Sequence, residues 1–301
     1  MKNQALISAL FSVAAWSQVS GPTPGYVFDA ATAQLRPMRG MAGTAYLGAA
    51  LIDETTAASA SEDGTLALAS RLGSVELVRG LDSASATRIA LTQEPGAVLF
   101  AWARHDVAAV FTETKKAKIW RGVDTKTDST VTIDLARIAG EIRSARFDGD
   151  RLILAASDGL YVSNGGEVSR LLEAGNISSI LIDGANLFVA DRELGQIVMI
   201  RNYGSQAATE RFAEVAEPVG MQMSRGRLLV ASAESRRVDA YDVTTGARTG
   251  SIELDFLPTR MESLGSRPLA LLNSRTADEP LYVLDSNDAL QVYFVPAGRD
   301  Q

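Results

Sequence analysis

The chain has 301 residues, of which 46% are hydrophobic and 22% charged, with no cysteine and a single histidine. This composition is typical of a globular protein with a large core, and it excludes disulfides, thiolate catalysis and cysteine-bound metals. The formal net charge is −7. Because Lys and Arg are scattered along the chain, the sequence offers no basic footprint for nucleic acid, which we exclude as a partner.

The first elements in the chain are a charged residue and a short apolar run. Lys2 precedes the apolar stretch 5–16, and the small residues Ala15 and Ser17 stand at the −3 and −1 positions before Gln18. This is the pattern of a secretory signal peptide, and the run is shorter than the ~20 apolar residues of a spanning helix. We predict a signal peptide at 1–17 and a secreted or periplasmic mature chain without a transmembrane anchor. A buried first helix is the alternative.

Further along, one apolar motif recurs six times at spacings of 35 to 45 residues. Each copy follows a short strand that ends in a turn, and two more short strands come after it. The copies are TLALAS from Thr65, DVAAVF from Asp106, RLILAAS from Arg151, NLFVAD from Asn186, RLLVAS from Arg227 and PLALLNS from Pro268. Four short antiparallel strands every ~40 residues, joined by glycine-containing turns, are typical of a β-propeller blade.

A seventh, partial unit precedes these six copies. The segment YVFDAATAQLRPM, Tyr26–Met38, resembles the outer hairpin VDAYDVTTGARTGSI of a later unit, so we expect it to help close the ring. The predicted fold is all-β, with a single domain at 26–298. It is a propeller of four-stranded antiparallel blades, seven with the partial N-terminal blade included, and six blades are the alternative.

Two stretches carry a family resemblance. NLFVADRELGQIVMI, Asn186–Ile200, and PLYVLDSNDALQVYFV, Pro280–Val295, resemble the repeats of secreted bacterial propellers of the NHL and YVTN type. In those repeats an LYVAD-like strand, a short polar turn and an I-x-V strand recur. The resemblance implies a binding or scaffold role more than catalysis.

Alignment of the repeats places polar residues just upstream of the first strand of several units. Loops that enter the innermost strands gather at one mouth of a propeller channel, so these side chains form a candidate ligand site: Glu54, Glu94, Glu141, Asn176 and Glu217. Hard oxygen ligands suit Ca²⁺ or Mg²⁺, and Glu141, Asn176 and Glu217 are the candidate metal ligands. The alternative is a set of solvated loop residues. The charged turn Asp191–Glu193 is expected on the opposite face.

No motif predicts a catalytic residue. The sole histidine, His105, lies in a turn, and the sequence has no G-x-S-x-G elbow, phosphate-binding glycine loop or H-E-x-x-H motif. The favoured function is therefore a non-catalytic module that binds a protein, peptide, glycan or small molecule at the mouth, and no cofactor is expected beyond Ca²⁺ or Mg²⁺. The alternatives are a lactonase-like metal-dependent hydrolase, with Glu94 or Glu54 as base, and a purely structural assembly module.

Overall fold

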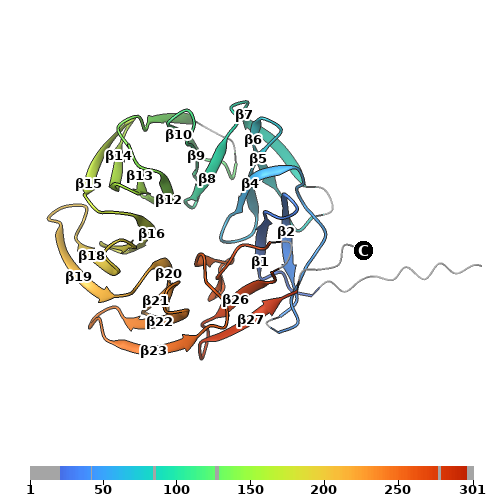
Figure 1. Ribbon diagram of the computed structural model, residues 1–301. Helices are drawn as coiled ribbons and strands as arrows, with labels where there is room; N and C mark the ends of the chain where they lie inside the picture. Colours follow the sequence, from blue (N-terminus) through green and yellow to red (C-terminus); the bar gives the residue numbers. More distant parts are fainter. Residues whose placement is uncertain (1–20, 42, 84–85, 126–128, 277–278, 297–301) are drawn as a thin grey trace, which may run out of the picture.

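The computed structural model describes residues 21–41, 43–83, 86–125, 129–276 and 279–296. These residues form seven antiparallel sheets arranged as blades around a central channel (Figure 1). The seven-bladed prediction is confirmed. The predicted signal peptide at 1–17 lies outside the described residues.

Each blade is one contiguous segment of the chain. Blade 1 has three strands, β1 (Gly25–Asp29), β2 (Gln34–Arg39) and β3 (Tyr46–Leu47). Blades 2 to 4 have four each: β4 (Thr55–Ala60), β5 (Leu66–Arg71), β6 (Ser74–Arg79) and β7 (Thr87–Thr92); β8 (Ala97–Trp102), β9 (Val107–Phe111), β10 (Lys116–Arg121) and β11 (Ser129–Asp134); β12 (Ile142–Asp148), β13 (Arg151–Ala156), β14 (Gly159–Asn164) and β15 (Glu167–Leu172).

Blades 5 to 7 repeat this pattern. Their strands are β16 (Ile177–Asp183), β17 (Asn186–Asp191), β18 (Gln196–Arg201) and β19 (Ala208–Glu214); β20 (Pro218–Ser224), β21 (Arg227–Ser232), β22 (Arg237–Asp242) and β23 (Arg248–Glu253); β24 (Glu262–Ser263), β25 (Leu269–Leu271), β26 (Leu281–Asp285) and β27 (Gln291–Val295).

Burial explains why the repeated motif is so apolar. The second strand of a blade lies between two neighbouring blades, which cover both of its faces, so β17 reads NLFVAD with its last five residues buried. The outermost strand has one covered edge only, and β19 is mostly exposed. The cores lie between blades, as where Phe188 and Met199 of blade 5 join Leu228 and Val230 of blade 6 in one cluster. Continuous apolar runs therefore mark the middle strands.

The N-terminal hairpin β1–β2 belongs to the first, partial blade. The N–H of Thr55, where β4 begins, donates to the carbonyl of Ala33 in the β1–β2 turn at 2.9 Å. In blade 6 the same face holds the turn between the second and third strands, because the N–H of Ala233 donates to the carbonyl of Glu217 at 3.0 Å. The β1–β2 turn therefore lies at the mouth, whereas β1 lines the channel and packs against β4, the innermost strand of blade 2. β1 takes the innermost position of a three-stranded first blade, and the predicted partial N-terminal blade is confirmed.

Side chains close the ring between blades 7 and 1, since no strand of the described residues crosses from one sheet to the other. Val27 and Leu47 of blade 1 pack with Leu281 and Val295 of blade 7 in one buried cluster. At the end of β1, the fully buried Asp29 carboxylate accepts a hydrogen bond from Arg275 and lies 3.6 Å from Arg36 Nη1. The seam thus combines apolar packing with a buried ionic cluster.

Candidate functional site

The predicted mouth residues lie where the chain enters the innermost strands. The residue directly before each of these strands in blades 2 to 6 is, in chain order, Glu54, Gly96, Glu141, Asn176 and Glu217. Glu94 lies two residues upstream of this position in blade 3. Four of the five predicted residues are therefore structurally equivalent, and Glu94 is their neighbour in the same loop series.

Backbone conformation explains why this position repeats. The φ angles are 55° at Glu54, 57° at Asn176, 44° at Glu217 and 84° at Gly96, all in the left-handed region. A β-bulge follows directly in these four blades. Gly and Asn adopt this conformation most readily, so the turn from one blade into the next selects the residue type here on conformational grounds.

Cationic side chains hold the first two predicted carboxylates. Glu54 Oε2 lies 3.0 Å from Arg71 Nη2, and Glu94 Oε2 lies 2.7 Å from Lys118 Nζ. Glu94 Oε1 also accepts a hydrogen bond from Thr114 Oγ1 at 3.0 Å. The bond from Lys118, followed by the bond from Thr114, lowers the pKa of the Glu94 carboxyl against the opposing effect of burial.

The three predicted metal ligands contact arginines. Arg143 bridges two of them, with its Nη2 3.0 Å from Glu141 Oε2 and its Nη1 donating to Asn176 Oδ1. Glu217 Oε1 lies 3.2 Å from Nη2 of a different arginine, Arg192. Within the described part of the chain, no group of three His, Cys, Asp or Glu residues is arranged to hold a metal ion. The geometry therefore gives the metal-ligand hypothesis no support.

The charged turn after β17 lies at this same mouth, contrary to prediction. Asp191 pairs with Ile177, the first residue of β16, and the N–H of Arg192 donates to the carbonyl of Asn176 at 3.2 Å. The physical reason is antiparallel pairing, which brings the end of a second strand beside the start of the first. Asp191 has a local role, because its Oδ1 accepts hydrogen bonds from the N–H groups of the next turn at 3.0 and 3.1 Å.

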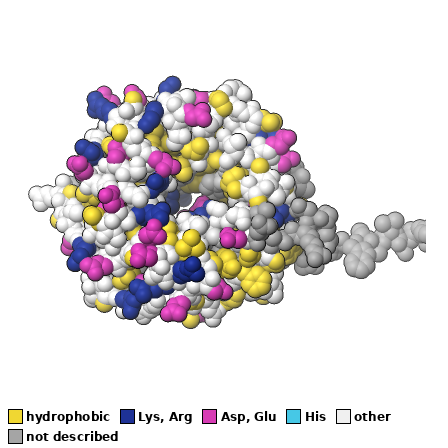
Figure 2. Space-filling model, viewed as in Figure 1, with side chains coloured by type: hydrophobic (Ala, Val, Ile, Leu, Met, Phe, Trp, Pro, Cys, Tyr) yellow, Lys and Arg dark blue, Asp and Glu magenta, His cyan; other side chains and the backbone are white. Residues whose placement is uncertain are grey.

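Behind the mouth, the innermost strands and β1 enclose a central channel with a cavity volume of about 400 Å³. Its charged lining residues are Arg143 and Arg146 of β12, Arg260 just before β24, and Glu262 of β24. Figure 2 shows Lys and Arg side chains gathered beside the central opening. The channel lining is thus cationic although the chain as a whole has a net charge of −7.

Two of these arginines have unused hydrogen-bonding capacity. Arg146 Nη1 donates to the carbonyl of Ala145 at 3.0 Å, and no carboxylate of the described residues forms an ion pair with it. Desolvation by the channel walls lowers the pKa of its guanidinium, and the charge of Glu262 opposes this shift. Arg260 pairs with Glu262 at 2.8 Å, while its buried Nη2 has no hydrogen-bond partner.

Sequence reasoning passed over these arginines, although a signal was present. At the positions of β16 and β20 that align with Arg143 stand Ser178 and Val219, and those that align with Arg146 hold Leu181 and Gln222. An arginine in an innermost strand, where β16 and β20 have small, apolar or neutral residues, marks a departure from these repeats.

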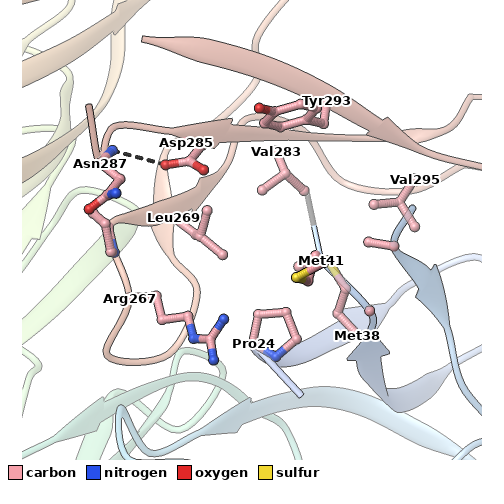
Figure 3. Close-up of a pocket in the computed structure, with 13 residues that line it drawn as sticks. Pro24, Met38, Met41, Arg267, Leu269, Val283, Asp285, Asn287, Tyr293 and Val295 are labelled. Atoms are coloured by element: carbon pink, nitrogen blue, oxygen red, sulfur yellow. Dashed lines mark hydrogen bonds between the residues drawn. The ribbon is translucent and has the colours of Figure 1, made fainter. Parts of the chain in front are cut away.

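A second cavity lies at the seam between blades 7 and 1 and has a volume of about 360 Å³ (Figure 3). Its walls are mainly apolar, and Met38, Leu269, Val283 and Val295 are among the residues that form them. Asp285 lies at its edge, where the carboxylate accepts the N–H of Asn287 at 2.9 Å. This volume and lining suit the apolar part of a small molecule.

The single imidazole belongs to neither cavity. His105 Nδ1 lies 2.8 Å from Asp124 Oδ2, and both side chains are more than a third exposed. Asp106 instead forms an ion pair with Arg121. The pair of His105 and Asp124 lies at the surface, in a turn as predicted, and contacts no other predicted site residue.

Comparisons with known proteins establish the fold. No family model matches the chain, and no curated protein matches its sequence. Among solved structures, AztD of Citrobacter koseri superposes with a TM-score of 0.59 at 13% identity and covers 91% of this chain and 95% of its own. A chain of the nidogen/laminin complex gives 0.55 at 11% identity, with coverage of 76% and 93%. A chain of the mitotic checkpoint complex gives 0.61 at 13% identity, with coverage of 99% and 90%.

These likenesses define the class of this protein as a seven-bladed β-propeller. At such identities they show the fold alone, and the NHL or YVTN type stays a prediction. None of the described residues forms a helix long and apolar enough to cross a membrane.

Proposed function

We propose that this chain is a secreted, non-catalytic propeller that binds a ligand bearing a negatively charged group in the central channel. The observation that carries the proposal is the cationic lining, with Arg143, Arg146 and Arg260 facing a single carboxylate, Glu262. A concave, low-dielectric channel strengthens the field of such a cluster and attracts anions. Arg146 is the recognition residue, because it is the channel arginine without an ion-pair partner among the described residues.

A binding assay with a charge-reversed pair of probes tests this function. Fluorescein-labelled hexaglutamate should bind to the protein, and the affinity should fall as salt is raised, whereas hexalysine should not bind. Arg146→Gln should weaken hexaglutamate binding by about tenfold or more, since a hydrogen bond to a charged group contributes about 1.5–3 kcal/mol.

The matched control is Arg137→Gln. Arg137 is 71% exposed, and its contact with Glu167 is a long 4.0 Å, so the substitution removes one positive charge without touching the channel. Equal affinity of the two variants, or equal binding of hexalysine, would exclude the channel as the anion site.

Export is tested separately by the N-terminus of the processed chain. The proposal of a signal peptide at 1–17 rests on the apolar run and on the small residues before Gln18. After expression of the full-length chain in a bacterial host, the periplasmic fraction should contain protein that begins at Gln18. A chain that retains Met1 and stays in the cell would contradict this part of the proposal.

A further inference from the structure

The cavity at the seam between blades 7 and 1, here called the seam cavity, exists because blade 1 fills its side of the seam incompletely. The outermost strand of blade 1, β3, has two residues, whereas the outermost strands of blades 2 to 6 have six or seven. Gly40 and Ala45, which line the cavity from the loop between β2 and β3, have little or no side chain. Protein interiors leave few voids larger than a water molecule, so an apolar space of about 360 Å³ is suited to a small ligand.

The register of blade 7 places a carboxylate on the face that borders this cavity. Leu269 of β25 stands opposite Asp285 of β26, and Val283, two residues before Asp285, stands opposite Tyr293 of β27. Opposite residues, and residues two apart on one strand, share a face of the sheet. This face is turned toward blade 1, because Leu269 and Val283 pack with Met38 in one buried cluster. Asp285 therefore stands on a mainly apolar face between two blades.

Two side chains of opposite charge border the seam cavity without neutralising each other. Within the described part of the chain, the Asp285 carboxylate accepts one hydrogen bond, from the N–H of Asn287 at 2.9 Å, and forms no ion pair. The guanidinium of Arg267 has neither a hydrogen bond nor an ion pair with a described residue. Arg267 is exposed and Asp285 is half-buried, so a ligand can reach both from solvent.

The seam cavity has a charged side and an apolar side (Figure 3). Arg267 and Asp285 lie on one side, and Met38, Met41 and Val295 lie on the other. Methionine side chains adapt their shape to aliphatic groups and make favourable contacts with aromatic rings. A ligand that matches this cavity carries a positive and a negative group at one end and an apolar group at the other.

We propose that the seam cavity binds a free α-amino acid with an apolar side chain. The ammonium group of the amino acid pairs with Asp285, its carboxylate pairs with Arg267, and its side chain lies against Met38, Val283 and Val295. An α-amino acid carries both charges on one carbon atom and a single side chain beyond them, which is the arrangement that the cavity requires. Charge-assisted hydrogen bonds to both groups fix its orientation.

Charge distinguishes this class from simpler amphiphiles. A monocarboxylate would leave Asp285 without a partner and would be repelled by it, and a monoamine would be repelled by Arg267 in the same way. The seam cavity shares no lining residue with the central channel, so this inference does not depend on the proposed function.

Isothermal titration calorimetry on the full chain tests the proposal with L-phenylalanine as the probe and L-leucine as a smaller second probe. Three analogues of L-phenylalanine each lack one part of it: 3-phenylpropanoate lacks the ammonium group, 2-phenylethylamine lacks the carboxylate, and L-alanine lacks the ring. Each should bind at least about tenfold more weakly than L-phenylalanine, since each loses a charged hydrogen bond or the apolar contact.

Two substitutions assign the charged contacts. Arg267→Gln should weaken binding of L-phenylalanine and of 3-phenylpropanoate by about tenfold or more, and it should not weaken binding of 2-phenylethylamine. Asp285→Asn keeps an acceptor for the N–H of Asn287 and should remove the preference for L-phenylalanine over 3-phenylpropanoate. The matched controls are Arg137→Gln and Asp288→Asn, whose side chains are 71% and 86% exposed and do not line the cavity, and both should leave the affinity unchanged.

The methyl groups of the cavity locate the bound amino acid. In ¹³C-methyl NMR spectra, L-phenylalanine should shift the signals of Leu269, Val283 and Val295, and the channel variant Arg146→Gln should bind it as tightly as the unchanged chain. Equal affinity for L-phenylalanine and 3-phenylpropanoate, or equal affinity of Arg267→Gln and Arg137→Gln for L-phenylalanine, would overturn the proposal. Failure of both amino acids to bind to a protein that still binds hexaglutamate would also overturn it, and the proposed function of the channel would stand.

Discussion

The buried ionic cluster at the seam makes a quantitative prediction about ring closure. Asp29 is fully buried, and its carboxylate forms ion pairs with Arg275 of blade 7 and Arg36 of blade 1. Each of these two arginines is 7% exposed. Asp29→Asn keeps the shape of the side chain and removes its charge. Two buried guanidinium groups would then lose their counter-charge, and Arg275 Nε has no hydrogen-bond partner that could compensate.

Removal of one member of a buried ion pair costs about 3–5 kcal/mol, so Asp29→Asn should lower the free energy of unfolding by that amount. At roughly 2 °C per kcal/mol for a chain of this size, the midpoint of thermal unfolding should fall by about 6–10 °C. Urea denaturation followed by circular dichroism gives the free energy, and a thermal scan gives the midpoint.

Arg137→Gln is the control, because it breaks an exposed pair that contributes about 0–1 kcal/mol. If Asp29→Asn unfolds within about 1 kcal/mol of the unchanged chain, the seam does not depend on this charge and the reasoning is wrong.

Two further predictions concern packing and pH. Gly220→Ala should lower the free energy of unfolding by about 1–3 kcal/mol, because a Cβ there would lie 2.3 Å from the Met261 N atom between blades 6 and 7. The control is Gly250→Ala, where the nearest atom to a Cβ lies at 3.9 Å, so its free energy of unfolding should stay within about 1 kcal/mol of the unchanged chain. Equal urea midpoints for the two variants would contradict this prediction. Glu94 has a lowered pKa in the folded state, so its ion pair stabilises the fold above the unfolded pKa and this contribution is lost as pH falls through the folded pKa. The urea midpoints of Glu94→Gln and the unchanged chain should differ at pH 7 and converge on acidification from about pH 5 toward pH 2, and a constant gap would refute the assignment.

The repeat alone predicted most of the fold. Apolar second strands such as RLLVAS and NLFVAD recur because neighbouring blades bury both of their faces, and this local requirement is visible in the letters. The position before the innermost strand was also visible, since Glu54, Asn176 and Glu217 align by counting back from the apolar motif.

What those side chains contact depended on residues from other strands and blades. Asn176 meets Arg143 of the preceding blade and Glu217 meets Arg192, and no spacing in the sequence specifies these partners. The face of the Asp191 turn was mispredicted for the same reason. Strand order and direction relate segments in space, and a hairpin pattern looks alike at either edge of a blade.

The sequence by itself determined the architecture of this protein, because hydrophobic burial and turn formation act over one repeat at a time. Only the tertiary structure decided its chemistry: the contact of Asp29 with Arg275 across 246 residues, and the gathering of arginines in the channel. Each of these depends on how the ring closes. Closure brings the first and last blades together, and that relation is not periodic.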